Sequence, residues 1–199
     1  MENIDEIVFV THNKGKAKSA EKYLKNIKFI TYDYELDEPR SDDIKLIAKA
    51  KVMEAYEMVK KPCLAMDADF YINSLNGFPK AFVNFALDTI GIDGILKLME
   101  EKEDRRCAFR QCVAYFDGVD IHYFFGESKG TLSIAKRGVD TDKKWSDLWY
   151  IFIPLGFNKT LAEMSDDERD NKRTVDKSTN ALEEFAKWYE NNDKNTKKW

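Results

Sequence analysis

The first thirty residues read as a strand, a polar loop, a helix and a second strand, and this order constrains the fold more than any other feature. The run Ile7–Val10 is β-branched and aromatic, residues 17–27 carry apolar side chains at helical spacing, and Phe29–Tyr32 is a second strand-like run. Such a unit is typical of α/β proteins. The loop at residues 11–16 follows the first strand, and ligands of open α/β sheets bind at the carboxyl ends of strands.

The rest of the chain alternates further helices and strands. Apolar side chains at helical spacing predict helices over residues 44–59, 92–99 and 181–189. Residues 41–43 supply an N-cap and an acidic first turn for the first of these helices, and residues 60–62 end it. Strands are predicted at residues 63–75, 107–116, 121–133 and 150–154. The turn Asp117-Gly118 makes the second and third of these an antiparallel pair.

Composition and charge favour a small ligand over nucleic acid or a membrane. The 199 residues predict one domain over residues 1–190 with a polar tail at 191–199. Lys and Arg total 32 and Asp and Glu total 36, so no net field attracts nucleic acid. No apolar stretch reaches the roughly 20 residues that span a bilayer, and no signal pattern opens the chain. We expect a soluble, cytoplasmic protein.

The three cysteines form an odd set without CxxC spacing, and His12 and His122 are the two histidines. This pattern disfavours a zinc site or a disulfide framework. Cys63 and Cys112 are interpreted as small apolar core residues in strands.

The loop at residues 11–16 suits an anion such as a phosphate. It offers a hydroxyl, an amide and two ammonium groups beside the free backbone N–H groups of a helix start. It is no Walker A loop, because GxxxxGK[ST] is absent. The alternative is that these residues only cap the helix.

Two acidic positions suit a hard cation opposite that loop. Asp67 follows an apolar run, and Glu38 lies in the acidic stretch 33–43. Mg²⁺ takes oxygen ligands and shares them with substrate phosphates. The alternatives are that Asp67 caps the next turn and that Glu38 lies in a solvated loop.

Five blocks in order resemble the inosine triphosphate pyrophosphatase (Ham1-like) family, over about residues 4–182. Residues 7–16 look like the opening strand and T-G-N-x-x-K loop, with His12 in place of glycine; residues 42–56 resemble the helix with a phosphate-side lysine; residues 62–79 are similar to D-S-G-L and L-x-G-x-P; residues 105–138 look like the central hairpin; and residues 154–164 resemble P-x-G-x-x-x-T-x-A-E-M.

The resemblance implies an α/β fold with a long mixed central sheet and two α/β lobes flanking a nucleotide cleft, and commonly a homodimer. It also implies Mg²⁺-dependent hydrolysis of a nucleoside triphosphate to a monophosphate and pyrophosphate. By carry-over, Thr11, Asn13 and Lys16 hold the triphosphate, Lys51 adds positive charge, Glu38 and Asp67 hold Mg²⁺, and Asp67 orients or deprotonates the attacking water.

Two segments depart from the family where it recognises the base. Residues 145–150 lack both glycines and the Asp-Pro of G-[FW]-G-[YW]-D-P, and residues 171–178 lack the S-H-R motif. A pocket that hydrogen-bonds a base edge discriminates by roughly 10⁴, so its replacement is expected to change base specificity.

Each replacement residue leaves two interpretations open. Trp145 and Trp149 either stack on a base or lie in the core. Lys172 and Arg173 either supply new donors to the substrate or lie on the surface. Asp69, where the family has glycine, either adds a metal ligand or faces solvent.

The first functional hypothesis is therefore a Mg²⁺-dependent nucleoside triphosphate pyrophosphatase with altered base specificity, acting on a non-canonical or modified nucleotide. The second is a catalytically impaired nucleotide-binding sensor or partner-binding module on the same fold. A plain α/β domain without a nucleotide site is the third.

Overall fold

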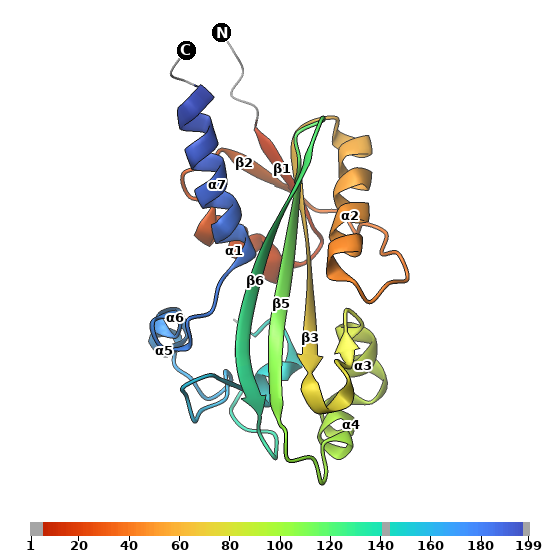
Figure 1. Cartoon of the computed structure of the whole chain (residues 1–199), viewed down its shortest axis with the longest axis vertical. Coiled ribbons are helices and arrows are strands. Elements are labelled where there is room, and N and C mark those ends of the chain that lie inside the picture. The colour runs from red at the N-terminus through yellow and green to blue at the C-terminus, as the bar shows by residue number, and fades with distance from the viewer. Residues whose placement is uncertain (1–5, 141–143, 197–199) are drawn as a thin grey trace. The chain divides into compact units, whose positions relative to one another are not determined.

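The computed structural model of the chain describes residues 6–140 and 144–196 (Figure 1). The strands are β1 (Ile7–Val10), β2 (Phe29–Tyr32), β3 (Cys63–Ile72), β4 (Pro79–Lys80), β5 (Arg106–Phe116), β6 (Ile121–Leu132) and β7 (Phe152–Pro154). The helices are α1 (Lys14–Tyr23), α2 (Ile44–Val59), α3 (Val83–Thr89), α4 (Gly91–Leu98), α5 (Asp166–Asn171), α6 (Arg173–Asp176) and α7 (Ala181–Thr196), with 3-10 turns η1 (Asn73–Leu75) and η2 (Asp147–Tyr150). Within these residues, no helix has the length and apolar character that a bilayer crossing requires.

Seven strands of the described chain form one mixed sheet in the order β2-β1-β3-β5-β6-β7, with β4 beside β3. β1 pairs in parallel with both β2 and β3, whereas β4 runs antiparallel to β3 and β7 antiparallel to β6. The predicted α/β class with a mixed sheet is confirmed, and so is the opening strand-helix-strand unit.

The turn between β5 and β6 forms where the sequence predicts it. Gly118 adopts a φ of 104°, a conformation that favours glycine. The side chain of Asp117 accepts hydrogen bonds from the backbone N–H groups of Val119 and Asp120, at 2.7 and 2.8 Å. The two strands are neighbours in the sheet, so the predicted hairpin is present.

The start of α2 differs slightly from the prediction. Asp43 is the N-cap, and its carboxylate accepts from the backbone N–H groups of Lys45 and Leu46. No acidic residue lies in the first turn, because Ser41 and Asp42 precede the cap. The helix ends as predicted, at Lys60 in a left-handed conformation.

The chain divides into two compact units, each assembled from separate stretches. Unit 1 comprises Met1–Ala68, Gln111–Gly126 and Asn180–Trp199, and unit 2 comprises Asp69–Arg110 and Glu127–Thr179.

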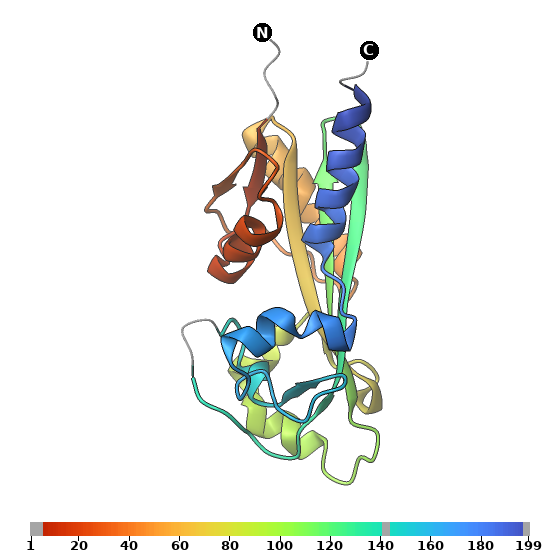
Figure 2. The same cartoon turned by 90° about the vertical axis from the view of Figure 1, so that its left-hand side faces the viewer.

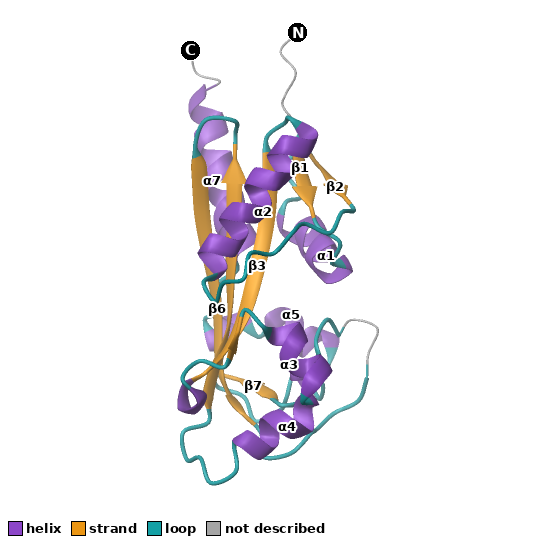
Figure 3. Cartoon of the chain, turned by 90° about the vertical axis from the view of Figure 1, so that its right-hand side faces the viewer, coloured by secondary structure: helices purple, strands orange, loops and turns teal. Residues whose placement is uncertain are grey.

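Unit 1 is built around strands with helices on both faces. Figures 1 and 3 show α2 and α7 on opposite sides of these strands, and Figure 2 shows α7 alongside them. Ile7 and Phe9 of β1 join one buried cluster with Phe185 of α7. On the other face, the thiol of Cys63 donates to the carbonyl of Val52 in α2, at 3.5 Å. Alternating strand residues therefore supply two apolar layers.

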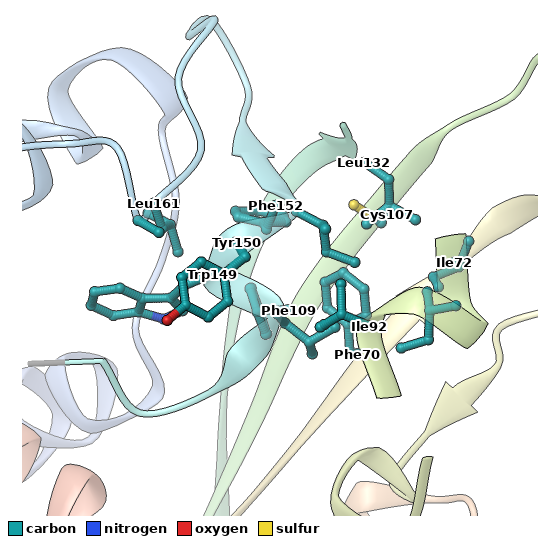
Figure 4. Close-up of a cluster of buried hydrophobic side chains, with 14 of the residues drawn as sticks. Phe70, Ile72, Ile92, Cys107, Phe109, Leu132, Trp149, Tyr150, Phe152 and Leu161 are labelled. Carbon is teal, nitrogen blue, oxygen red and sulfur yellow. The ribbon is translucent and has the colours of Figure 1, made fainter. Parts of the chain in front are cut away.

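Unit 2 has a separate, aromatic core (Figure 4). The ring of Phe109 in β5 lies 4.6 Å from that of Phe70 in β3 and 4.8 Å from that of Phe152 in β7, measured between centroids. Ile92 and Ile95 of α4 complete this part of the cluster. Tilted and edge-on ring packing of this kind stabilises a core beyond its buried area.

All three cysteines are free and buried. Cys63 lies in β3 and Cys112 in β5, which confirms their interpretation as core residues.

Several element boundaries differ from the prediction. β3 ends at Ile72 because the chain turns into η1, so residues 73–75 are not strand. Tyr150 belongs to η2 instead of β7. The short helices α3, α5 and α6 were not predicted. Helix α7 continues through residues 191–196 of the predicted polar tail, and residues 197–199 lie outside the described chain.

Candidate functional site

The loop after β1 is shaped by two local hydrogen bonds. Asn13 is the N-cap of α1, and its side-chain oxygen accepts from the backbone N–H of Lys16 at 3.0 Å. The hydroxyl oxygen of Thr11 accepts from the backbone N–H of Asn13 at 3.2 Å. Asn13 thus has the capping role that was the alternative interpretation, whereas Thr11 fixes the turn just before the helix. Their contact with a triphosphate stays a prediction.

Strand alternation places Asp67 under helix α2. Leu64 and Met66 of β3 belong to the cluster shared with α1 and α7, so Cys63, Ala65 and Asp67 point to the other face. That is the face on which Cys63 contacts α2. An acidic side chain at this position therefore needs a partner from α2 or from the loop before it.

That partner is Lys51, a buried lysine of α2. Its ammonium donates hydrogen bonds to Asp67, at 3.0 Å, and to Glu38 in the loop that precedes α2. The ammonium of Lys16 lies 3.9 Å from the same Asp67 oxygen and donates to the carbonyl of Met66 at 2.9 Å. The four charged residues predicted for phosphate and metal binding, Lys16, Lys51, Glu38 and Asp67, therefore meet within unit 1.

Burial distinguishes the members of this cluster. The side chains of Lys51 and Asp67 are 9% and 7% exposed, Lys16 is 22% exposed, and Glu38 is 59% exposed. Charged side chains are rarely buried unless they are paired, and here each buried charge has a partner of opposite sign.

The environment shifts the pKa of three of these groups. Burial lowers the pKa of Lys16, and repulsion from Lys51 adds to the effect of burial. Burial opposes the charged form of Lys51 too, but attraction from Asp67 and the hydrogen bond to Glu38 outweigh it and raise its pKa. Burial raises the pKa of Asp67 against the attraction of both lysines. Charged groups whose pKa is shifted by burial and by close charge partners often gather at functional sites.

Trp149 lies in the core of unit 2. It is 6% exposed, the ring of Trp145 packs edge-on against it, and the guanidinium of Arg169 lies 5.3 Å from its ring centroid. Its indole N–H is buried and has no hydrogen-bond partner in the part of the chain that the structure describes. This is the core position that was the alternative to base stacking, and a substrate contact stays a prediction.

Lys172 is half-buried. Its side chain is 17% exposed, and its ammonium donates to Asp176 at 2.7 Å, to Ser178 at 3.1 Å and to Ser128 at 3.2 Å. Arg173 is half-buried and donates to the backbone carbonyl of Ser178 at 3.0 Å. Both side chains are half-buried and hydrogen-bonded within unit 2, so neither is a freely solvated surface residue. Their predicted role as donors to the substrate stays untested.

Asp69 is neither exposed nor part of the Lys51 cluster. Its side chain is 1% exposed, and Arg110 of β5 binds it through two hydrogen bonds, of 2.9 and 2.5 Å. The guanidinium of Arg110 also stacks on the ring of Tyr71 at 4.5 Å. The solvent-facing interpretation is wrong. The Asp69–Arg110 pair was not predicted, because 41 residues separate the two in the sequence. They meet because β3 and β5 are adjacent strands of the sheet.

Comparisons with known proteins find the same family that the sequence motifs resemble. The sequence matches the family model described as the Ham1 family over residues 7–188. A protein of Methanopyrus kandleri named dITP/XTP pyrophosphatase is 35% identical over 191 residues, covering 94% of this chain and 97% of the relative. A protein of the same name from Thermococcus kodakarensis is 32% identical over 188 residues, with 94% and 98% covered.

Solved structures show the same fold. A HAM1 protein from Coxiella burnetii superposes with a TM-score of 0.80 at 20% identity, covering 94% of this chain and 100% of the other. The Ham1 protein of Staphylococcus aureus gives a TM-score of 0.74 at 20% identity, with 93% and 99% covered. The resemblance drawn from the five sequence blocks is confirmed, and the chain belongs to the Ham1 family.

Proposed function

We propose that this protein is a Mg²⁺-dependent nucleoside triphosphate pyrophosphatase, which hydrolyses a nucleoside or deoxynucleoside triphosphate to a monophosphate and pyrophosphate. The names of its relatives support this activity. The observation that carries the proposal is the convergence of Lys16, Lys51, Glu38 and Asp67, which join two ammonium groups and two carboxylates in one unit.

The two lysines are suited to hold phosphate oxygens. Lysine is a compact point charge with three donors on a flexible stem, so it can exchange a protein partner for a phosphate. Lys16 also follows the start of α1, where backbone N–H groups and the helix dipole favour an anion. Thr11 and Asn13 fix the shape of this helix start.

The carboxylates fit Mg²⁺ by their chemistry. Glu38 and Asp67 present hard oxygen donors toward a single nitrogen, that of Lys51. Mg²⁺ is commonly bound through one or two carboxylates, with substrate phosphates and water as the other ligands. The described residues contain no group of three or more His, Cys, Asp or Glu that would make an all-protein cage. A bound Mg²⁺ would neutralise charge on the phosphates and fix their orientation.

Asp67 is the candidate to orient the attacking water and accept its proton. In the proposed reaction the water oxygen attacks the α-phosphorus in line, and the bond from this phosphorus to the bridging oxygen of the β-phosphate breaks. Pyrophosphate leaves with the electron pair. Lys16 and Lys51 stabilise the charge that develops on it.

The proposal includes an altered base preference, because residues 145–150 and 171–178 lack the motifs with which other members of the family recognise the base. Two of the candidate substrate-binding residues in unit 2 already have structural roles, since Trp149, the candidate for base stacking, is buried in the core and Lys172, a candidate donor, is bound by Asp176, Ser178 and Ser128. A hydrogen-bonding pocket that loses its donors loses much of its discrimination. The discrimination between bases is thus expected to be altered, and we propose a modified or non-canonical nucleotide as the substrate.

A panel of nucleoside and deoxynucleoside triphosphates tests this function, with pyrophosphate release as the readout. The wild-type protein should release pyrophosphate from at least one nucleotide, and only with Mg²⁺. Asp67→Asn should lose this activity while remaining folded, whereas Asp88→Asn, at an exposed position of α3, should keep it.

The same panel of nucleotides tests the second hypothesis, in which the protein is a nucleotide-binding sensor or partner-binding module without turnover. Triphosphate binding in a thermal-shift assay, without release of pyrophosphate from any nucleotide, would support the sensor and contradict the pyrophosphatase.

The proposal extends to a cytoplasmic homodimer, as the resemblance implies. Light scattering during gel filtration would measure the mass against 23.2 kDa for one chain. A mass of one chain at micromolar concentration would contradict the dimer. Fractionation of the source cells would test the location.

A further inference from the structure

The ammonium of Lys51 occupies the space between the two carboxylates proposed as metal ligands. It donates to one oxygen of Glu38 and to one oxygen of Asp67, the latter at 3.0 Å. An ammonium contacts a carboxylate oxygen at about 2.8 Å and Mg²⁺ contacts it at about 2.1 Å. The two cations therefore compete for the same two oxygens.

The charges of this cluster are balanced without a metal. Lys16 and Lys51 carry two positive charges, and Glu38 and Asp67 carry two negative charges. A divalent cation added alone would leave an excess of two positive charges beside Lys51 and Asp67, whose side chains are largely buried. Repulsion between like charges is strong where water is excluded, so the metal alone is disfavoured.

We infer that Lys51 is an internal counter-cation that keeps divalent metal out of this site until a phosphate chain arrives. The inference rests on the proposed function, because it takes Glu38 and Asp67 as the metal ligands. The negative phosphates attract the ammonium of Lys51, whose flexible stem lets it turn toward them. Both carboxylates are then free, and metal and triphosphate bind as one unit.

Lys16 is held differently and provides an internal comparison. It donates to the backbone carbonyl of Met66, and its ammonium is 3.9 Å from the nearest Asp67 oxygen. It therefore does not occupy a carboxylate oxygen directly. Removing its charge should change metal affinity less than removing the charge of Lys51.

The test is Mn²⁺ binding to the nucleotide-free protein, followed by the paramagnetic resonance signal of free Mn²⁺. Lys51→Met keeps the apolar stem and removes the charge, and it should bind Mn²⁺ at least about tenfold more tightly than wild type. Lys51→Gln should show the same direction. Lys49→Met, at an exposed position of the same helix, should bind like wild type, and Lys16→Met should show the smaller change.

Equal or weaker Mn²⁺ binding in a folded Lys51 variant would overturn the inference. Circular dichroism checks the folding of each variant. If Lys51→Met fails to fold, Lys51→Gln replaces it in the test, because the glutamine amide still donates a hydrogen bond to the carboxylates. Lysine side-chain NMR of the wild-type protein is a further readout. The Lys51 ε-methylene signal should stay unchanged with Mg²⁺ alone and shift when Mg²⁺ and a non-hydrolysable triphosphate are added together. A shift with Mg²⁺ alone would contradict the inference.

A second titration separates this inference from the proposed function. Mn²⁺ is titrated with an α,β-methylene triphosphate into wild type, Glu38→Gln and Asp67→Asn. If both variants bind Mn²⁺ like wild type, the metal site lies elsewhere and the site assignment fails as well. If both lose Mn²⁺ while the Lys51 variants bind free Mn²⁺ no more tightly than wild type, only the counter-cation inference fails.

Discussion

The two units use buried charge in different ways. In unit 1, Lys51 holds Asp67 and Glu38, and Glu38 remains largely exposed, so a ligand can exchange these partners. In unit 2, Asp69 is bound bidentately by Arg110, and Asp176 has the ammonium of Lys172 and the backbone of Ser178. Phosphate and metal chemistry therefore fit the cluster of unit 1, whereas the charged pairs of unit 2 have the character of structural ion pairs.

The largest expected effect is loss of turnover on neutralising Asp67. Asp67→Asn removes the proposed base and one metal ligand, and it should lower kcat by about 10³-fold. The amide still accepts a hydrogen bond from Lys51, so the thermal midpoint should change little. Steady-state pyrophosphate release and thermal melts measure both. Unchanged kcat would remove Asp67 from the reaction.

Breaking the Asp69–Arg110 pair should affect stability. Arg110→Met leaves a carboxylate that is 1% exposed without its partner, and should destabilise the protein by about 3 kcal/mol in denaturant unfolding. Arg106→Met, at an exposed position of the same strand, is the control and should leave the unfolding midpoint unchanged. A stable Arg110→Met variant with impaired nucleotide binding would show that unit 2 presents a binding residue there.

Lys172→Met also tests whether a charged residue of unit 2 stabilises the fold or binds the substrate. Asp176 is fully buried and would keep only its contacts with Ser178, so we expect a loss of about 2 kcal/mol in stability. The KM for the best nucleotide should change by less than twofold. A raised KM with unchanged stability would instead make Lys172 a substrate donor, as the sequence first suggested.

Lys16→Ala should weaken triphosphate binding by about tenfold, which is the effect of one lost charge-assisted contact. Monophosphate binding should weaken less, because Lys16 is assigned to the phosphate chain. Lys18→Ala, an exposed neighbour on α1, serves as the control. Calorimetry with both nucleotides measures the difference, and equal losses would argue against this role.

The smallest effect concerns the core thiols. Burial raises the pKa of Cys63 and of Cys112 from 9.0 to about 12, so neither should react with a disulfide reagent at pH 8 until the protein unfolds. The folded state favours the protonated thiol, so stability should fall as pH rises from about 9 toward 12. Rapid labelling of the native protein would place these thiols at the surface.

Local patterns predicted most of the fold. The strand, helix and second strand at the start of the chain follow from apolar periodicity, and the hairpin follows from Asp117-Gly118. Helix α5 begins with a capping box of Ser165 and Glu168, a signature that can be read directly from the sequence. Helix α3 offered only a short apolar run without a capping residue, since Phe82 precedes it.

The sequence predicted which residues form the candidate site, but it did not predict every contact between them. The resemblance placed Glu38 and Asp67 at one metal ion, but it did not predict that Lys51 contacts both carboxylates, which depends on the alternation of β3 and on the face that α2 covers. The Asp69–Arg110 pair depends on the order of strands in the sheet, which no single segment of sequence encodes. Long-range contacts of this kind need the fold before they can be assigned.

The most direct measurement is pyrophosphate release from the nucleotide panel in rising Mg²⁺, comparing wild type with Asp67→Asn. If Lys16, Lys51, Glu38 and Asp67 form a metal and triphosphate site, wild type releases pyrophosphate only with Mg²⁺ and the variant releases about 10³-fold less. Release at the same rate in a metal chelator, or in the variant, would contradict this assignment.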